Sequence, residues 1–408
     1  MEVLYPKCAG LDVHKEVIVA SVRVVESGRV QRWLNRFATT TRGILALVDW
    51  LRDYGCTQVG MEATGVYWKP VWHLLEGEFG LTLANAAAVR NVPGRKSDVN
   101  DATWLSDLLA HGLIRDSFVP PAPIQQLRDL TRTRKQLVRE VCQHTQRLQK
   151  TLEDGNVKIT GVISDLLGVS GRAILRGLIE GETDPERLLQ LAGGRLKAPR
   201  QRLLDGLQGA VTDHHRFLLR LHLNHIEGLE QLIREVEAQI ESLLDPFRDA
   251  YQRLQTIPGV SRVVAQTLLA EIGADMSHFP SSAHLVSWAG LCPRLDESAG
   301  KGRSKRLRHG DGWLKPVLVQ AAWAASRSKD TYLHSQFVRL RSRRGPKKAV
   351  VAVAASILTA AYFILRDGVV YKDLGPHYLE HLDKTKTAKR LAQRLQNLGY
   401  QVELRPAA

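Results

Sequence analysis

Residues 7–25 read KCAGLDVHKEVIVASVRVV and decide the fold at the start of the chain. From Val17 to Val25 the residues are mostly β-branched, and both alternating faces of the run are largely apolar. This pattern predicts a strand that is buried on both sides, and we expect strands across residues 7–36. Asp12 interrupts the first apolar segment, so we expect a carboxylate on the first strand.

Helices and strands are expected to alternate after these leading strands. Apolar residues at helical spacing predict a helix over 41–53, and a short strand should end at Glu62. Three further segments are expected to be a helix over 66–78, a strand over 81–84 and a helix over 98–111. Leading strands followed by such alternation indicate an α/β layout with a mixed sheet.

The rest of the chain is expected to be mainly helical. Pro120, Pro121 and Pro123 break the chain, and heptad-spaced apolar residues then predict long helices over 124–152 and 213–245. An intramolecular helical hairpin and an oligomerising coiled coil both remain possible for this pair. The heptad positions that we expect to face a partner are Leu127, Leu130, Leu137, Val141 and Leu148, then Leu218, Leu229, Leu232, Val236 and Leu243.

Two C-terminal segments carry further expectations. The turn Ile257-Pro258-Gly259-Val260, with a helix over 262–272, resembles half of a helix-hairpin-helix element, which can present backbone N–H groups to a phosphate. Residues 349–365 are almost continuously apolar, and we expect a buried helix there rather than a membrane span. We also expect no signal peptide, because charged residues interrupt the first apolar stretch.

Composition indicates a polyanionic partner. The 408 residues include 57 Lys and Arg against 42 Asp and Glu, a formal net charge of +15, and nucleic acid is the usual partner of such a surplus. A basic protein kept soluble by its charge is the alternative. The four cysteines form no C-x-x-C pair, so neither a zinc site nor a disulfide framework is expected.

Four acidic residues form the candidate catalytic set. Asp12 lies on the first strand, Glu62 ends a later strand, and Asp98 and Asp101 are three residues apart, which places both on one face of a helix. Four converging carboxylates repel one another unless cations lie between them, and two Mg²⁺ ions about 4 Å apart resolve the repulsion. Taken singly, each acid is also compatible with a helix cap or a surface charge, and Asp98 could cap its own helix.

These residues belong to motifs that resemble a known family. The motifs are G-L-D-V-H-K at 10–15, M-E-A-T-G-V-Y-W at 61–68 and V-P-G-R-K-S-D-V-N-D-A at 92–102, then I-P-G at 257–259, A-G-L-C-P at 289–293, E-S-A-G at 297–300 and R-H-G-D at 308–311. Together they resemble the DEDD transposases of bacterial insertion sequences, the insertion sequence 110 family, whose relatives include the pilin-gene invertases.

The resemblance implies a domain plan. An α/β RuvC-like (ribonuclease-H-like) nuclease domain is expected at 1–120, and a long helical coiled-coil region at 121–245. A mainly α C-terminal transposase domain is expected at 246–372, with the helix-hairpin-helix-like element and a nucleophilic serine. From the residues alone, a basic tail is expected at 373–408, where Lys386, Lys389, Arg390 and Arg394 punctuate a helix.

The resemblance also assigns roles to residues. Asp12, Glu62, Asp98 and Asp101 are the implied metal ligands, and Ser298 is the implied nucleophile. Ser304 is the alternative, because this chain has Ser-Ala-Gly where many relatives have Ser-Gly-Gly. From chemistry alone, a serine in such a Gly-rich basic loop is more often a turn residue. The implied nucleic-acid-binding residues are Lys301, Arg303, Lys305, Arg306 and Arg308.

The implied function is an insertion-sequence transposase or site-specific DNA recombinase that uses two Mg²⁺ ions and a covalent serine intermediate. Its implied partners are double-stranded donor and target DNA, a guide RNA encoded by the element, and further copies of the chain in a dimer or tetramer, with no membrane. A cytoplasmic, nucleoid-associated bacterial location follows. The alternatives are a RuvC-like junction nuclease without a covalent intermediate and a non-catalytic nucleic-acid-binding remnant.

Overall fold

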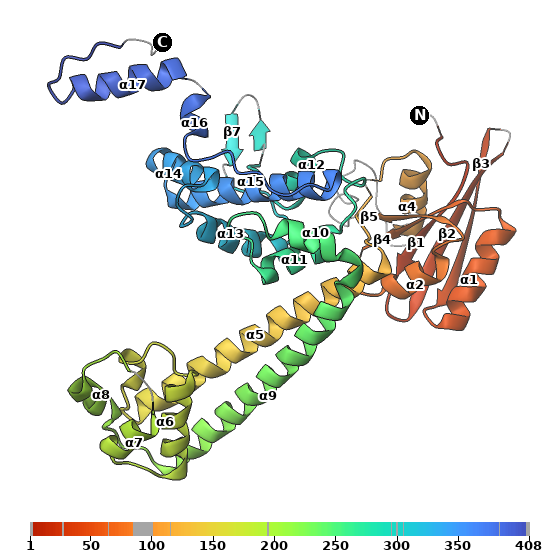
Figure 1. Cartoon of the computed structure of the whole chain (residues 1–408). Helices are drawn as coiled ribbons and strands as arrows, with labels where there is room; N and C mark the ends of the chain where they lie inside the picture. Colours follow the sequence, from red (N-terminus) through yellow and green to blue (C-terminus); the bar gives the residue numbers. More distant parts are fainter. Residues whose placement is uncertain are drawn as a thin grey trace. The chain divides into compact units, whose positions relative to one another are not determined.

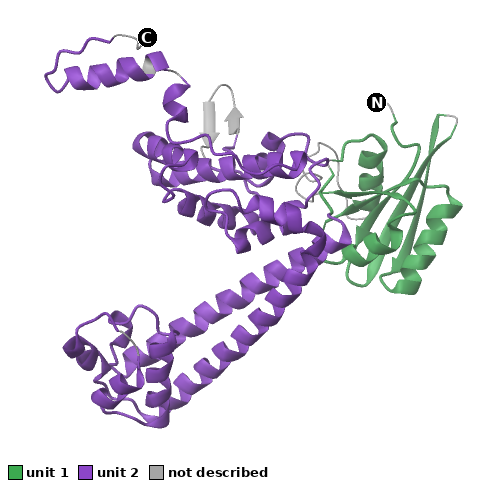
Figure 2. Cartoon of the chain, in the orientation of Figure 1, with its two compact units in different colours: residues 1–119 green, residues 120–408 purple. Residues whose placement is uncertain are grey.

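The computed structural model describes residues 3–26, 28–63, 65–84, 101–114, 116–193, 196–294, 296–298, 301–304, 306–382 and 384–404. The chain divides into two compact units, residues 1–119 and residues 120–408, which are coloured separately in Figure 2. We describe each unit by itself. The four-part plan expected from the sequence stays a prediction.

Unit 1 is built on a five-stranded mixed sheet with the order β3-β2-β1-β4-β5. β1 pairs antiparallel with β2, and β2 with β3, whereas β1–β4 and β4–β5 are parallel pairs. The expected mixed sheet is therefore confirmed, and the arrangement fits a ribonuclease-H-like domain. The strands are β1 (Lys7–Val13), β2 (Val17–Glu26), β3 (Arg29–Ala38), β4 (Gln58–Glu62) and β5 (Gly80–Ala84).

Helices cover both faces of this sheet (Figure 1). Ala9, Leu11 and Val13 of β1 join the apolar core formed with α1 (Thr41–Asp53) and α2 (Trp68–Leu75). The even residues face α4 (Asp101–Ala110), since the Cys8 thiol donates to the Ser106 carbonyl at 3.5 Å. Because side chains alternate along a strand, Asp12 is on the α4 face.

A glycine lets α4 approach the sheet closely. A Cβ added at Gly10 would lie 2.2 Å from the Ala102 carbonyl oxygen and 2.5 Å from the Ser106 backbone nitrogen. Only hydrogen fits in that space, so the first turns of α4 rest directly on the backbone of β1. This contact holds Asp101, the first residue of α4, next to the central strand.

Unit 2 begins with a long pair of helices. α5 (Ala122–Asp154) and α9 (Asp213–Leu243) pack along each other in opposite directions (Figure 1). Both long helices were expected. On α9, Leu229 is buried and Val236 and Leu243 pack against the core as predicted, but the predictions for Leu218 and Leu232 were wrong. Leu232 is 47% exposed, whereas Leu219, Ile226 and Ile240 are buried at multiples of seven residues. At the start of α9 the buried residue is therefore Leu219 rather than Leu218.

An outer core forms at the far end of this helix pair. Its helices are α6 (Val169–Glu180), α7 (Pro185–Leu191) and α8 (Arg200–Leu207), which pack with the ends of α5 and α9 that lie farthest from the C-terminal helices (Figure 1). None of these three short helices was expected. The outer core shares no buried residue with the core of the C-terminal helices.

The C-terminal part of unit 2 is a helical bundle around α15 (Pro346–Asp367), which packs against α10, α12, α13 and α14. Among the described residues, α15 alone has the length and composition of a membrane span, and half of its most apolar window is buried. Core helices pass the same test. The other elements here are α10 (Arg248–Leu254), α11 (Arg262–Ile272), α12 (Ser282–Trp288), β6 (Asp296–Ser298), β7 (Lys301–Ser304), α13 (Leu314–Ala325), α14 (Tyr332–Arg344), α16 (Tyr378–His381) and α17 (Lys384–Gln396).

Two 3-10 turns, Ile159–Gly161 and Asp245–Phe247, complete the described helical segments of unit 2. The turn at residues 257–260, before α11, packs against α13. A Cβ at Gly259 would lie 2.3 Å from the Ala321 carbonyl oxygen of α13, and Ile257 is only 1% exposed. Gly259 also has a φ of +85°, so the position needs glycine for two reasons.

Candidate active site

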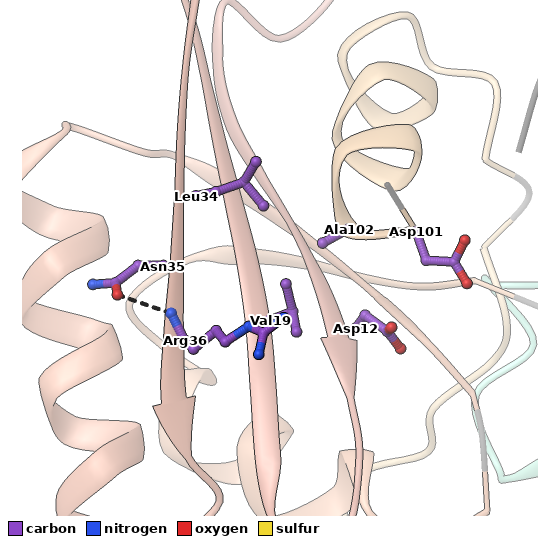
Figure 3. Close-up of a pocket in the computed structure, with 7 residues that line it drawn as sticks. All are labelled: Asp12, Val19, Leu34, Asn35, Arg36, Asp101 and Ala102. Carbon is purple, nitrogen blue, oxygen red and sulfur yellow. Dashed lines mark hydrogen bonds between the residues drawn. The ribbon is translucent and has the colours of Figure 1, made fainter. Parts of the chain in front are cut away.

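Two of the four predicted acids line one cavity of about 440 Å³ in unit 1 (Figure 3). Asp12 projects from β1 and Asp101 from the first turn of α4. They lie 89 positions apart in sequence, and the close contact of α4 at Gly10 brings them together. The other lining residues are Val19, Leu34, Asn35, Arg36 and Ala102.

Strand register places Glu62 beside Asp12. The parallel pairing of β1 with β4 runs to Leu11 and Met61, so Asp12 and Glu62 are the next residues on the two strands. Gly60, two residues earlier, faces the Leu105 and Leu109 side chains of α4. Glu62 is therefore on the same face of the sheet as Asp12. Asp98 lies outside the described residues.

The donor chemistry of the cavity suits Mg²⁺, which prefers carboxylate oxygens. The donor set is incomplete, however, within the described part of the chain. There, no group of three or more His, Cys, Asp or Glu side chains is arranged to hold a metal ion. The Asp12 Oδ2 atom lies 3.1 Å from Nε2 of the His14 ring and accepts a hydrogen bond when that nitrogen carries a proton.

Arg36 is a cavity residue that the sequence did not suggest. Val19 is the cross-strand partner of both Asp12 and Arg36, so the three residues form one row across β1, β2 and β3. Cross-strand partners project from the same face, which puts a guanidinium and two carboxylates around one space. Finding this row needs the pairing register of three strands, and no local motif carries that information.

Two ionic contacts, one of them to a buried arginine, connect α4 to the sheet. Asp107 of α4 accepts hydrogen bonds from Arg23 Nε at 2.9 Å and from Arg32 Nη2 at 2.7 Å. The Arg23 side chain is only 4% exposed, so Asp107 compensates a charge that is almost removed from water. Burial also raises the pKa of the Cys8 thiol, under the same helix, to about 11. Cys8 is therefore an uncharged thiol at neutral pH.

The predicted serine lies on a short strand pair in unit 2. β6 and β7 are antiparallel, with Ser298 opposite Lys301 and Ser304 opposite Asp296. The two candidate serines thus lie at opposite ends of the pairing, about 7 Å apart along the strands. Arg303 is also on β7, Arg306 and Arg308 follow it as exposed residues, and Lys305 is outside the described residues.

The family motifs on either side of this strand pair meet at its base. The Arg294 N–H donates to the Arg306 carbonyl at 2.9 Å, and the Arg308 N–H donates to the Cys292 carbonyl at 3.1 Å. A Cβ at Gly310 would lie 2.3 Å from the backbone of Ala289 and Gly290, so the two segments touch through glycine. The loop expected around Ser298 is therefore a strand pair seated on the helical bundle.

Comparison with known proteins identifies both motif blocks. Residues 9–156 match a family model described as "Transposase", and residues 251–339 match one described as "Transposase IS116/IS110/IS902 family". The chain belongs to the insertion sequence 110 family of transposases. The two matches contain the cavity of unit 1 and the β6–β7 pair of unit 2, respectively.

Three relatives are 28–30% identical to this chain over the segments that align with it. An "Insertion element IS110 uncharacterized 43.6 kDa protein" of Streptomyces coelicolor is 29% identical over 48% of this chain and 50% of its own length. A "Transposase for insertion sequence element IS1111A" of Coxiella burnetii is 28% identical over 50% and 57%. A "Pilin gene-inverting protein" of Moraxella bovis is 30% identical over 35% and 46%. The chain thus spans about half the length of the curated relatives that it matches.

Proposed function

We propose that this protein is a transposase or site-specific DNA recombinase of an insertion sequence, acting on double-stranded donor and target DNA in the bacterial cytoplasm. The observation that carries the proposal is the cavity between β1 and α4, where Asp12 and Asp101 converge with Arg36. Carboxylates beside a cation in an open cavity suit phosphodiester chemistry, because the acids hold metal ions and the cation attracts the phosphate.

In this proposal Asp12, Glu62, Asp98 and Asp101 hold two Mg²⁺ ions. Bound there, the metal would activate the attacking oxygen and stabilise the leaving oxygen of the phosphodiester. The chain itself sets the spacing of the carboxylates, through the register of β1 with β4 and the seating of α4 on Gly10. His14, which does not line the cavity, orients the Asp12 carboxylate through its ring nitrogen.

Isosteric changes of the cavity acids test the nuclease assignment. We expect Asp12→Asn and Asp101→Asn to abolish cleavage of supercoiled DNA and to remove the rise in melting temperature that Mg²⁺ produces. Asp53→Asn is the matched control, since Asp53 is exposed at the end of α1. Full cleavage by folded Asp12→Asn protein would refute the assignment.

We propose Ser298 as the nucleophile. Its Oγ forms a bond to a DNA phosphorus while one P–O bond of the backbone breaks, and the serine proton goes to the departing oxygen. A strand hydroxyl reverses the step and rejoins DNA, with no external energy source. Ser298→Ala should therefore give no trapped protein–DNA adduct on nicked substrate, whereas Ser304→Ala should keep it. Mass spectrometry locates the modified residue, and an adduct at Ser304, or none in the wild type, contradicts the choice.

We further propose that an RNA encoded by the element guides the enzyme to its sites. The surplus of 15 positive charges is available to neutralise such a ligand. Protein expressed with its native flanking DNA should co-purify with one discrete RNA, and recombination should stop after RNase treatment. Equal recombination by RNA-free protein would exclude the guide.

The proposed enzyme is at least a dimer. Within each copy, α5 and α9 form a coiled coil. Ser298 of one copy acts together with the Asp12 cluster of the other copy. The acids belong to unit 1 and the serine to unit 2, so a site shared between copies predicts complementation. Mixing Asp12→Asn with Ser298→Ala protein should partly restore cleavage, because mixed dimers contain one intact pairing. No recovery despite demonstrated subunit exchange would place each site within one chain.

A further inference from the structure

Three cations surround one tryptophan at the start of α13. Arg132, Lys135 and Arg139, on successive turns of α5, lie 5.3, 5.3 and 5.7 Å from the centre of the Trp313 ring. The Lys135 ammonium also donates a hydrogen bond to the Trp313 carbonyl at 3.2 Å. We call Trp313, Lys135 and Arg139 the tryptophan clamp.

Trp313 is firmly held by its neighbours. Asp311 accepts hydrogen bonds from the backbone N–H groups of Trp313 and Leu314, at 2.7 and 2.6 Å, and so fixes the first turn of α13. Arg132 makes two hydrogen bonds, at 2.9 and 2.7 Å, to the fully buried Glu271. The charge of Arg132 is thus compensated inside the protein.

The charges of Lys135 and Arg139 are not compensated in the same way. Within the described part of the chain, no carboxylate lies within ion-pair distance of either head group. Burial and the nearby Arg139 guanidinium lower the pKa of Lys135 from its ordinary value. Two cations are therefore held close together against their mutual repulsion, which an external anion would relieve.

Further cations extend from the clamp towards the strand pair that carries Ser298. The Lys315 ammonium, in the first turn of α13, donates to the Arg308 carbonyl at 3.3 Å. The Arg308 guanidinium donates to the Ser287 hydroxyl at 3.1 Å, and its backbone N–H pairs at the base of β6 and β7. Several cations along one path suit the repeated phosphates of a nucleic acid strand better than they suit a single small anion.

We propose that the tryptophan clamp is a phosphate-binding site for the DNA backbone next to the strand pair that carries Ser298, with Lys135 and Arg139 contacting phosphates and Trp313 positioning both cations. This inference rests on the proposed function and adds a contact site outside the expected residues Lys301–Arg308. The ring holds the two side chains through cation–π attraction, so less of their conformational entropy is lost when DNA binds.

The salt dependence of DNA binding tests the clamp. Each phosphate contact contributes about 0.9 to the slope of log K against log salt for duplex DNA. For the full chain and a short duplex, Lys135→Gln and Arg139→Gln should each lower the slope by about 0.9, and the double variant by about 1.8. Lys150→Gln is the matched control, an exposed lysine on the same helix about 16 Å beyond Arg139; its slope should equal that of the wild type.

The role of the ring is tested separately. Trp313→Phe keeps a ring for the cations and should bind DNA nearly as the wild type does, whereas Trp313→Leu should bind several-fold more weakly. Unchanged slopes in the two charge variants, while the wild type binds and cleaves DNA, would overturn the clamp but leave the proposed function intact. A wild type that neither binds nor cleaves DNA would instead refute the proposed function. A slope change seen with an RNA hairpin and not with the duplex would overturn the assignment to DNA.

Discussion

Gly10→Ala should separate the two carboxylates of the cavity without changing either. The added methyl group would meet the Ala102 carbonyl oxygen at 2.2 Å and the Ser106 nitrogen at 2.5 Å, and both are backbone atoms of α4. Ordinary carbon contacts lie near 3.5–4.0 Å, so α4 must move away from β1 by about 1 Å. Asp101, in the first turn of α4, moves with it.

The expected loss of unfolding free energy depends on which atoms must move to accommodate the methyl group. Overpacking against a rigid backbone costs about 1–3 kcal/mol of unfolding free energy. Gly60→Ala is the matched control, because its methyl group would face the same helix but meet the flexible Leu109 side chain at 3.3 Å. Removing a glycine also restricts the unfolded chain, by about 0.4–1 kcal/mol, so Gly60→Ala should be close to neutral.

Hydrogen exchange in increasing urea, followed on peptides covering β1 and α4, gives the opening free energy of each variant. Gly10→Ala should lower this free energy by about 1–3 kcal/mol, and DNA cleavage should fall with it. Equal stability of the Gly10→Ala and Gly60→Ala proteins would refute the argument. So would full cleavage by Gly10→Ala protein, since it would show that the seating of α4 does not set the position of Asp101.

Three further changes test other contacts. Arg23→Met removes the 2.9 Å bond to Asp107 and should lower the stability of unit 1 by about 2 kcal/mol in urea unfolding, whereas an unchanged midpoint would show that Arg32 alone suffices. Glu271→Gln leaves the guanidiniums that it compensates without a carboxylate and should cost about 3–5 kcal/mol, measured in the same way; a loss below about 1 kcal/mol would contradict the pairing. His222→Gln tests the pH dependence of stability. Burial, then nearby Arg and His charges, lower the pKa of His222 in the folded protein. The contribution of neutral His222 to the free energy of unfolding is therefore complete above about pH 6.5 and is lost as the pH falls. Melting temperatures near pH 5 and pH 7.5 should therefore differ less in the variant than in the wild type, and an equal difference would exclude His222 as the cause.

Local pattern predicted the sheet well because each strand shows its own signal. The apolar run around Asp12, the strand ending at Glu62 and the helix face of α1 follow from alternation and helical spacing alone. The same pattern placed two acids of the cavity on the correct elements. Their convergence on one face, in contrast, depends on strand register and on the contact at Gly10, which the sequence does not display.

Elements that depend on distant partners were missed. The pairing of β6 with β7 involves only short strands in a Gly-rich basic segment, and its anchor is the meeting of Gly290 and Gly310, 20 positions apart. The start of the α9 stripe was misplaced by one residue because Leu218 and Leu219 are both apolar, and only the packing partners select which one is buried. Two helices of the outer core, α7 and α8, have only 7 and 8 residues, about two turns each, which is too short to show a clear period.

The long helix pair α5–α9 amplifies small changes of angle into large displacements of the outer core at its end. Its helices have 33 and 31 residues, so each is about 45–50 Å long. A tilt of about 10° where the pair leaves the bundle therefore carries the outer core through about 8 Å. The contact between the two helices repeats every seven residues, through Leu219, Ile226 and Ile240. The length of the α5–α9 pair can therefore change only by whole repeats of seven residues if this contact is to be kept. Removing seven residues from both helices would shorten the pair by about 10 Å and keep the register of the contacts between them.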